Sequence, residues 1–332
     1  MEKQGEKKSE KAILAGILAI EVFLVLAILF FLSMPILNQV YAVVGANNVT
    51  VTTLLQVGNV FPEVTTVIIN SGNAITLVPN ATAGVPIYVV VRDFNGEADI
   101  QNVSVIFWNT ATSTYGSAND NNRHYTNISC NLNASYGTIY EVNATCIVPL
   151  YYFADPGNWN ATITAFDNES LSNQNSSNMS VNSLLALGLP DVINYGIVNA
   201  TTVSPEAMAN VTNFGNVMIN ISVKGYAIYQ GDNLSMNCSL GALKNISIDY
   251  EKYNMTNSIA GAQTLSQFQA NYTNLSASAV IRRMNVPYRQ NDVAPFTDDT
   301  NTTYWRMYVP IGVAGSCQGS IIFGAVQSPG FG

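Results

Sequence analysis

Gly157–Phe166 reads GNWNATITAF, and apolar side chains alternate with polar ones along most of it. Successive side chains of a β-strand point to opposite faces, so this pattern predicts a strand over Trp159–Phe166 with one face in a core. Similar short runs recur at spacings of roughly 8–12 residues, separated by clusters of Gly, Pro, Asn and Asp. The pattern predicts an all-β protein built from β-sandwiches.

The runs divide into two groups, which predict one sandwich over residues 43–181 and a second over 182–332. The first group is Val49–Val57, Val64–Ile69, Ile87–Arg92, Val103–Trp108, Tyr125–Cys130, Thr138–Ile147 and Trp159–Phe166. The second is Leu185–Leu189, Val192–Val198, Ala209–Asn213, Val217–Val223, Leu234–Cys238, Ile246–Tyr250, Ala277–Ile281, Trp305–Val309 and Ser320–Val326. The Ser- and Asn-rich stretch Asn168–Asn178 lies near the boundary, and Thr256–Thr273 is expected to be a loop or a short helix.

Before both groups lies an apolar segment, Ala12–Leu32, whose one charge is Glu21. As an α-helix it would be about 32 Å long, the thickness of a bilayer's hydrocarbon core. Four lysines precede it within residues 1–11, and the next Lys or Arg is Arg92. The asymmetry predicts a single-pass cell-membrane protein that spans the lipid bilayer with residues 12–34, with a cytoplasmic amino terminus and extracellular carboxyl-terminal domains.

Two alternatives to an uncleaved signal anchor stay open. Val40-Tyr41-Ala42 has the small residues of a signal-peptidase site, so the mature chain could begin at Val43. Gly16–Glu21, with sequence GILAIE, resembles the amino-terminal signature of type IV pilins. That resemblance implies cleavage after Gly16, pairing of the Glu21 carboxylate with a neighbouring amine, and a homo-oligomeric filament assembled through the helix.

Composition limits the classes of function. The chain has 332 residues, only 10% of them charged, and a formal net charge of −8. An acidic exterior argues against nucleic acid as a partner. The single histidine, His124, is expected on the surface or in a loop, because no G-x-S-x-G motif or second imidazole accompanies it. We expect a protein that is not an enzyme.

The four cysteines, Cys130, Cys146, Cys238 and Cys317, form no C-x-x-C pair. An even number in an exported region indicates disulfides. Two fall in each expected domain, so the simplest pairing is 130–146 and 238–317, and buried free thiols are the alternative.

Asparagine is the most informative residue, because twenty positions fit N-x-[ST]. All lie after the apolar segment, which favours N-linked glycans on the outer side. Part of the excess has a simpler origin, since Asn-apolar-Ser is also an ordinary polar-out strand pattern. The positions are Asn48, Asn80, Asn102, Asn127, Asn133, Asn143, Asn160, Asn168, Asn175, Asn178, Asn199, Asn210, Asn220, Asn233, Asn237, Asn245, Asn254, Asn271, Asn274 and Asn301.

One turn has the composition of a cation site. Asp93, Asn95 and Asp99 surround Gly96, and alternating oxygen ligands around a glycine could hold Ca²⁺. An ordinary loop, with Asp and Asn bonded to their own backbone, is the alternative. No other cofactor is expected.

Asp298-Asp299 is expected to be a solvated turn. Tyr151–Phe153 could stack on a sugar, but filling of a sandwich core or edge is the commoner use of such residues.

Both groups of strands resemble the immunoglobulin-like repeats of archaeal cell-surface proteins. The resemblance rests on Val91–Ile100 with Val103–Val105, on Asp155–Thr164, on Val211–Val217, and on Tyr304–Trp305 through Pro310, Gly315 and Gly319–Ile321. It implies two immunoglobulin-like β-sandwiches after one transmembrane helix, with a structural or adhesive role in the envelope. Other surface proteins or glycans are the implied partners. The pilin-like subunit is the alternative function, and a carbohydrate-binding or carbohydrate-active surface protein is a third.

Overall fold

The computed structural model describes residues 50–291 and 299–329 of the chain. Its contacts divide the chain into residues 1–58 and 59–332, and the second unit contains all the strands discussed below. The expected membrane segment at 12–34, with Gly16 and Glu21, lies outside the described residues, as does Asn48. Within the described residues, no helix has the length and apolar character that a membrane span requires.

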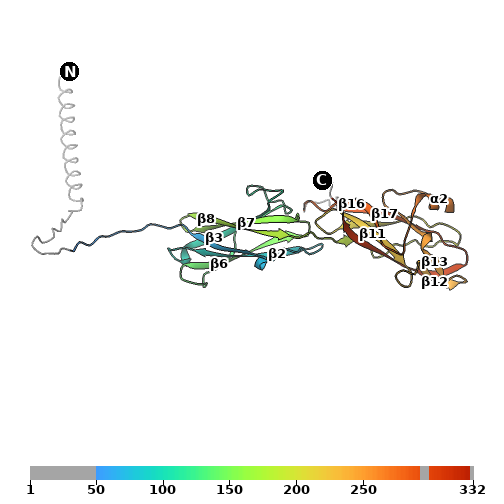
Figure 1. Cartoon of the computed structure of the whole chain (residues 1–332), viewed down its shortest axis with the longest axis horizontal. Coiled ribbons are helices and arrows are strands. Elements are labelled where there is room, and N and C mark those ends of the chain that lie inside the picture. Colours follow the sequence, from blue (N-terminus) through green and yellow to red (C-terminus); the bar gives the residue numbers. More distant parts are fainter. Residues whose placement is uncertain (1–49, 292–298, 330–332) are drawn as a thin grey trace, which may run out of the picture. The chain divides into compact units, whose positions relative to one another are not determined.

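The first sandwich consists of two four-stranded antiparallel sheets (Figure 1). One has the order β1 (Glu63–Ile69), β2 (Thr82–Arg92), β6 (Glu141–Tyr151), β5 (Asn131–Asn133). The other has the order β4 (His124–Asn127), β3 (Ile100–Asn109), β7 (Gly157–Asp167), β8 (Ser172–Val181). The central strands are β2 with β6 in the first sheet and β3 with β7 in the second.

The strand predicted over Trp159–Phe166 is confirmed as part of β7. Trp159, Ala161, Ile163 and Ala165 are all fully buried, and they pack between the two sheets. The Trp159 ring lies 5.0 Å from the Phe107 ring of β3, centroid to centroid. Its indole Nε1 donates to the carbonyl oxygen of Asp155 at 2.8 Å, so the buried N–H is satisfied.

The second sandwich is less regular. A five-stranded sheet has the order β15 (Thr273–Asn274), β14 (Glu251–Asn254), β17 (Thr300–Met307), β10 (Ala207–Asn213), β9 (Leu187–Gly188). Two three-stranded sheets face it, with orders β16 (Val280–Val286), β11 (Ile219–Tyr226), β19 (Ser320–Gln327) and β13 (Asn245–Ser247), β12 (Leu234–Gly241), β18 (Val313–Gln318). Trp305 and Tyr253 lie in its core. The one α-helix of the described residues, α2 (Leu265–Asn271), begins at a Thr264–Gln267 capping box.

Two strand predictions are wrong, and one strand was not predicted. Residues 50–57 of the predicted strand Val49–Val57 form no strand, although their pattern favours one, because they have no neighbouring strand to pair with. Val192–Val198 is likewise irregular. The Ser- and Asn-rich boundary stretch instead forms most of β8, because it is an edge strand whose side chains face solvent and need no apolar residues.

Both predicted disulfides are confirmed. Cys130 is bonded to Cys146 of β6, and Cys238 of β12 to Cys317 of β18, which lies directly opposite it. All four cysteines of the sequence are therefore paired.

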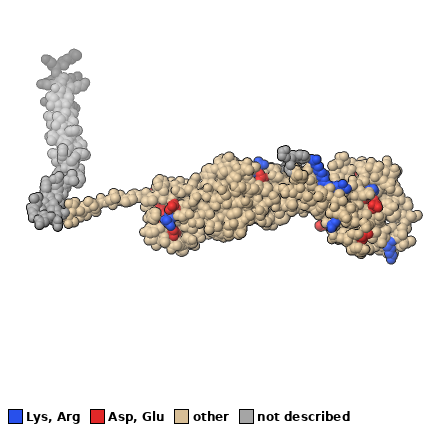
Figure 2. All heavy atoms as spheres, in the orientation of Figure 1, with Lys and Arg blue, Asp and Glu red and all other residues tan. Residues whose placement is uncertain are grey.

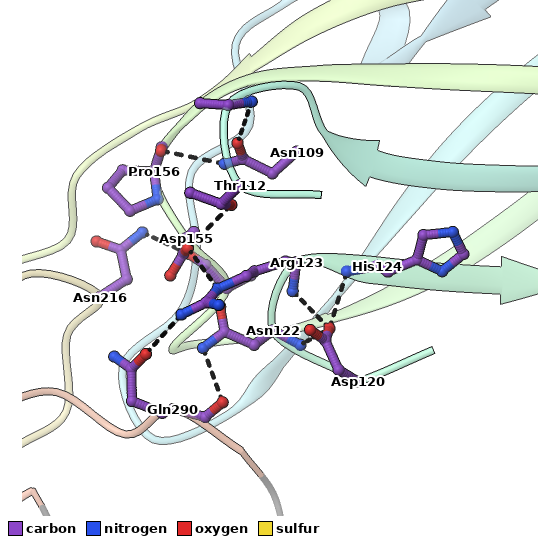
Figure 3. A network of polar contacts seen from close by, with 12 residues as sticks. Asn109, Thr112, Asp120, Asn122, Arg123, His124, Asp155, Pro156, Asn216 and Gln290 are labelled. Atoms are coloured by element: carbon purple, nitrogen blue, oxygen red, sulfur yellow. Dashed lines mark hydrogen bonds and ion pairs between the residues drawn. The ribbon is translucent and has the colours of Figure 1, made fainter. Parts of the chain in front are cut away.

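A polar junction joins the two sandwiches (Figure 3). Asn216, fully buried in the second, donates to the carbonyl oxygen of Ala154 at 2.9 Å and to that of Asn182 at 3.1 Å. Its Oδ1 accepts from the Leu184 N–H at 2.7 Å. Every polar atom of this side chain is thus satisfied inside the protein, which is the condition for burying it at low cost.

A second set of contacts surrounds Asp155 (Figure 3). Its Oδ2 pairs with Arg123 Nε at 3.1 Å, and its Oδ1 accepts from the Tyr288 hydroxyl at 3.0 Å. Arg123 also donates to the Gln290 side chain at 2.9 Å, and Asn122 to the Gln290 carbonyl at 2.9 Å. Because Tyr288 and Gln290 follow β16, the carboxylate links the two halves of the molecule.

We expect Asn216→Ala to uncouple the two sandwiches. The change leaves the Leu184 N–H and two carbonyls without their partner, at a cost of about 1–3 kcal/mol in the free energy of unfolding. Differential scanning calorimetry should show the transition splitting or broadening. The control is Asn73→Ala, an exposed residue whose side chain bonds only to Ser71. Equal effects of the two changes would contradict the role given to the junction.

Candidate metal centre

Three carboxylates converge at one end of the first sandwich. Asp93 directly follows β2, Asp99 ends the short 3₁₀ turn η2 (Glu97–Asp99), and Asp167 is the last residue of β7. The pairing of Ile100 with Asp167 across β3 and β7 brings the last two together. One oxygen from each residue lies within 4.8 Å of those of the other two.

Asp93 is fully buried, and its two oxygens are used differently. Oδ1 accepts from the Asn95 N–H at 2.8 Å, which closes the turn toward Gly96. Oδ2 is buried and has no hydrogen-bond partner among the described residues. A buried carboxylate oxygen without a partner is costly, so this atom needs either a proton or a cation.

Asp167 is also fully buried, and hydrogen bonds fix its orientation. Its Oδ1 accepts from the Leu171 N–H at 2.7 Å, and its Oδ2 accepts from Asn59 Nδ2 at 2.7 Å. The Asp99 carbonyl accepts from the Asn168 N–H at 3.0 Å, which ties the turn η2 to the end of β7. These hydrogen bonds hold the side chain of Asp167 and the turn η2 in place beside each other.

The electrostatics of the cluster are unfavourable without a counter-ion. Burial raises the pKa of Asp93, and the charges of Asp99 and Asp167 raise it further, against the lowering effect of the Asn95 N–H. Desolvation and the same two neighbours raise the pKa of Glu169, which follows in the next turn. None of the ion pairs in the described part of the chain joins Asp93, Asp99 or Asp167 to a Lys or Arg.

This donor set fits a hard divalent cation. Two oxygens on opposite sides of a Ca²⁺ ion lie about 4.8 Å apart, because each ligand is about 2.4 Å from the metal. The three carboxylates fit that span, and the unpartnered Asp93 Oδ2 supplies a ligand atom at no loss of an existing hydrogen bond. A bound Ca²⁺ would neutralise the charge that raises the two pKa values.

The structure brings together two of the three residues that the sequence suggests. Asp93 and Asp99 belong to the cluster, whereas the Asn95 Oδ1 accepts from the Val60 N–H at 2.8 Å. Asp167 is the residue that the sequence analysis missed. The sequence does place an Asp at the end of the predicted strand that became β7. It does not show which other strand ends lie beside that Asp, because this depends on how β7 pairs with β3.

The other predicted sites have ordinary roles. His124 is buried at the start of β4, with Nε2 3.3 Å from the Tyr115 carbonyl oxygen, so its expected exposure is wrong. Phe153 is fully buried and stacks on Tyr151, and the Arg289 guanidinium lies 5.6 Å from its ring, which is the core use of these aromatics. Asp299 is buried and pairs with Arg289 at 3.9 Å, whereas Asp298 lies outside the described residues.

The sequons differ in exposure. Twelve of the asparagines are exposed, namely Asn80, Asn133, Asn168, Asn175, Asn178, Asn199, Asn210, Asn233, Asn237, Asn245, Asn271 and Asn274. Asn220 is buried, and its Oδ1 accepts from the N–H groups of Met284 and Asn285. We therefore do not expect a glycan on Asn220 in the folded protein. The remaining six of the nineteen sequons within the described residues are partly exposed.

A second buried carboxyl lies in the second sandwich. Glu251 of β14 accepts a hydrogen bond from the Tyr195 hydroxyl at 2.8 Å. Burial raises its pKa to about 7, although the Tyr195 hydrogen bond acts in the opposite direction. Both residues line a cavity. With this pKa, the Glu251 carboxyl is expected to carry a proton in weakly acidic solution.

Comparison with known proteins does not assign a family. No family model and no curated protein matches the sequence. Among solved structures, the chain is similar to a carbohydrate-binding module of the β-sandwich superfamily, at 10% identity over 81% of this chain and 98% of that one, with a TM-score of 0.22. It is also similar to the carboxyl-terminal domain of the Streptococcus agalactiae AgI/II polypeptide BspA, at 9% identity over 77% and 96%, with a TM-score of 0.19. The fold is defined by the sheets themselves.

We expect Ca²⁺ to stabilise the wild-type chain and not the Asp93→Asn variant. Removing a buried negative charge should raise the thermal midpoint of the variant in EDTA, while abolishing the further rise that Ca²⁺ gives the wild type. At 100 times the dissociation constant, binding adds about 2.7 kcal/mol to the free energy of unfolding.

Differential scanning calorimetry with and without Ca²⁺ makes the measurement. Glu97→Gln is the control, because it removes a carboxylate from the same turn that is not one of the three. The site would be contradicted if Ca²⁺ did not raise the thermal midpoint of the wild type. It would also be contradicted if Ca²⁺ raised the midpoints of Asp93→Asn and Glu97→Gln equally.

We expect the second sandwich to lose stability as the pH rises through about 7. The folded-state pKa of Glu251 lies above its ordinary value of 4.5. Its contribution is therefore fully present below about pH 4.5 and is lost as the carboxyl ionises in the folded state. Hydrogen exchange of β14 and β17 between about pH 5 and 8, corrected for intrinsic rates, tests this. Glu251→Gln should remove the dependence, and its persistence would count against this residue.

Proposed function

We propose that this chain is an exported, membrane-anchored and N-glycosylated protein of the cell surface with a structural or adhesive role. One observation carries the proposal: all four cysteines form disulfides, one within each sandwich. Structural disulfides form and persist in oxidising compartments, outside the cytoplasm. In this proposal the apolar segment 12–34 anchors the chain, and both sandwiches are immunoglobulin-like and lie outside the membrane.

The proposed role is mechanical and organisational. The junction around Asn216 and Asp155 joins the two sandwiches by buried, satisfied polar contacts, so that one module restrains the other. In the first sandwich, Ca²⁺ would be held by Asp93, Asp99 and Asp167 and would fix the loops at that end. Only 10% of the residues are charged, and Figure 2 shows Lys, Arg, Asp and Glu only in scattered places on the face drawn. Glycans at the exposed sequons would cover such a surface.

Mass spectrometry of the mature protein from its native cells, before and after deglycosylation, tests the proposal. We expect an intact amino terminus and a mass decrease that maps to exposed sequons. Protease treatment of whole cells should release residues beyond the apolar segment. A cytoplasmic, unglycosylated protein would overturn the proposal. A start at Ile17 would instead favour the pilin-like alternative, and a start at Val43 a secreted protein.

A further inference from the structure

Residues 50–58, with sequence TVTTLLQVG, are an extended segment without a neighbouring strand. Four large apolar side chains in it are exposed, with 74% for Val51, 94% for Leu54, 88% for Leu55 and 74% for Val57. Their composition is β-branched and apolar, the kind that forms strands. So much apolar surface in so short a segment indicates a binding partner.

The second sandwich has an edge strand that is complementary to such a segment. β19, with sequence SIIFGAVQ, pairs with β11 on one side and is the last strand of its sheet. Its core-facing residues Ile321, Phe323 and Ala325 are only half-buried, whereas their counterparts on β7 are fully buried. An apolar strand with one unpaired edge is a template for another strand.

A cavity of about 790 Å³ lies beside this edge. Met236, Met307, Val309 and Phe323 contribute apolar surface to it, and the irregular segment 189–198 lines it as well. The space opens to solvent beside the strand, and it is large enough to receive apolar side chains of an added strand.

We propose that residues 50–58 of one copy of the chain add as a strand to the free edge of β19 in a second copy. The backbone of the segment would pair with the backbone of β19, and alternate side chains of the segment would enter the cavity. This is the strand-addition mode of recognition, in which backbone hydrogen bonds provide affinity and pockets for alternate side chains provide specificity.

The length of the chain favours a second copy over the same one. Asn59 is bonded to Asp167, at one end of β7, whereas the junction with the second sandwich lies beside Ala154, at the other end. The eleven residues of β7 span about 35 Å. Nine residues reach at most about 30 Å. The segment is therefore too short to lie along β19 of its own chain.

Association of this kind is directional. The donor segment and the acceptor edge are different surfaces, so each copy can donate once and accept once. Such head-to-tail contacts form rings or open filaments. Anchoring in one membrane would raise the effective concentration and favour the contact.

Sedimentation velocity of the full chain in detergent, over a hundredfold range of concentration, tests the proposal. We expect concentration-dependent oligomers of the wild type and monomers of Leu54→Asn/Leu55→Asn. The two residues face opposite sides of a strand, so one of them enters the cavity in either register. Because both are exposed in the free chain, the variant should fold normally.

Ile128→Asn/Ile139→Asn is the matched control, since these residues of the first sandwich are 75% and 70% exposed. It should associate like the wild type. Hydrogen exchange should show Ile321–Val326 protected in wild-type oligomers and exchanging at least tenfold faster in the Leu54→Asn/Leu55→Asn variant. A wild type that stays monomeric, or oligomers that both variants form equally, would overturn the proposal. The second outcome would assign assembly to another part of the chain.

Discussion

The pairing of β7 with β3 and β8 is the constraint on which the described structure depends. This strand buries Trp159, Ala161 and Ile163 in the core, and the backbone ladder on both sides fixes its register. The same register places the polar residues at its two ends. Asp155, just before the strand, lies in the junction, and Asp167, its last residue, lies in the carboxylate cluster. A slip of one residue would exchange the faces and disperse both sites.

Much of the fold could be predicted from the sequence, because the alternation of apolar and polar residues along a strand is a local signal. The strands whose apolar face enters a core, such as β3, β6, β7 and β11, follow from their own residues. The simplest disulfide pairing could be predicted because two cysteines fall in each expected domain. β8 is not predicted from the sequence and residues 50–57 are wrongly predicted as a strand for the same reason: whether a segment forms a strand depends on a neighbouring strand. The polar β8 pairs along its whole length with β7, whereas the apolar Val51 and Leu55 have no strand to pair with.

The carboxylate cluster shows the same limit. Asp93 and Asp99 are close in sequence, and a turn with this composition suggests a cation. Asp167 is 68 residues further along, and only the register of β3 against β7 brings it to the other two. Asn95 looked equivalent to its neighbours, but the Val60 N–H occupies its oxygen. Burial, which makes Asp93 Oδ2 available and raises its pKa, is likewise a property of the assembled fold.

The burial of Asn220 sets an order of events for biosynthesis. Its side chain caps the N–H groups of Met284 and Asn285, which are synthesised more than 60 residues later. If an oligosaccharyltransferase acts on the emerging chain, the sequon stays accessible throughout that interval, and a sugar attached then would exclude Asn220 from its place beside β16. A chain that carries sugar at this one position could not close the sheet between β11 and β16. In a glycosylated chain, correct folding would therefore require either that Asn220 is a poor acceptor or that glycans are added after folding.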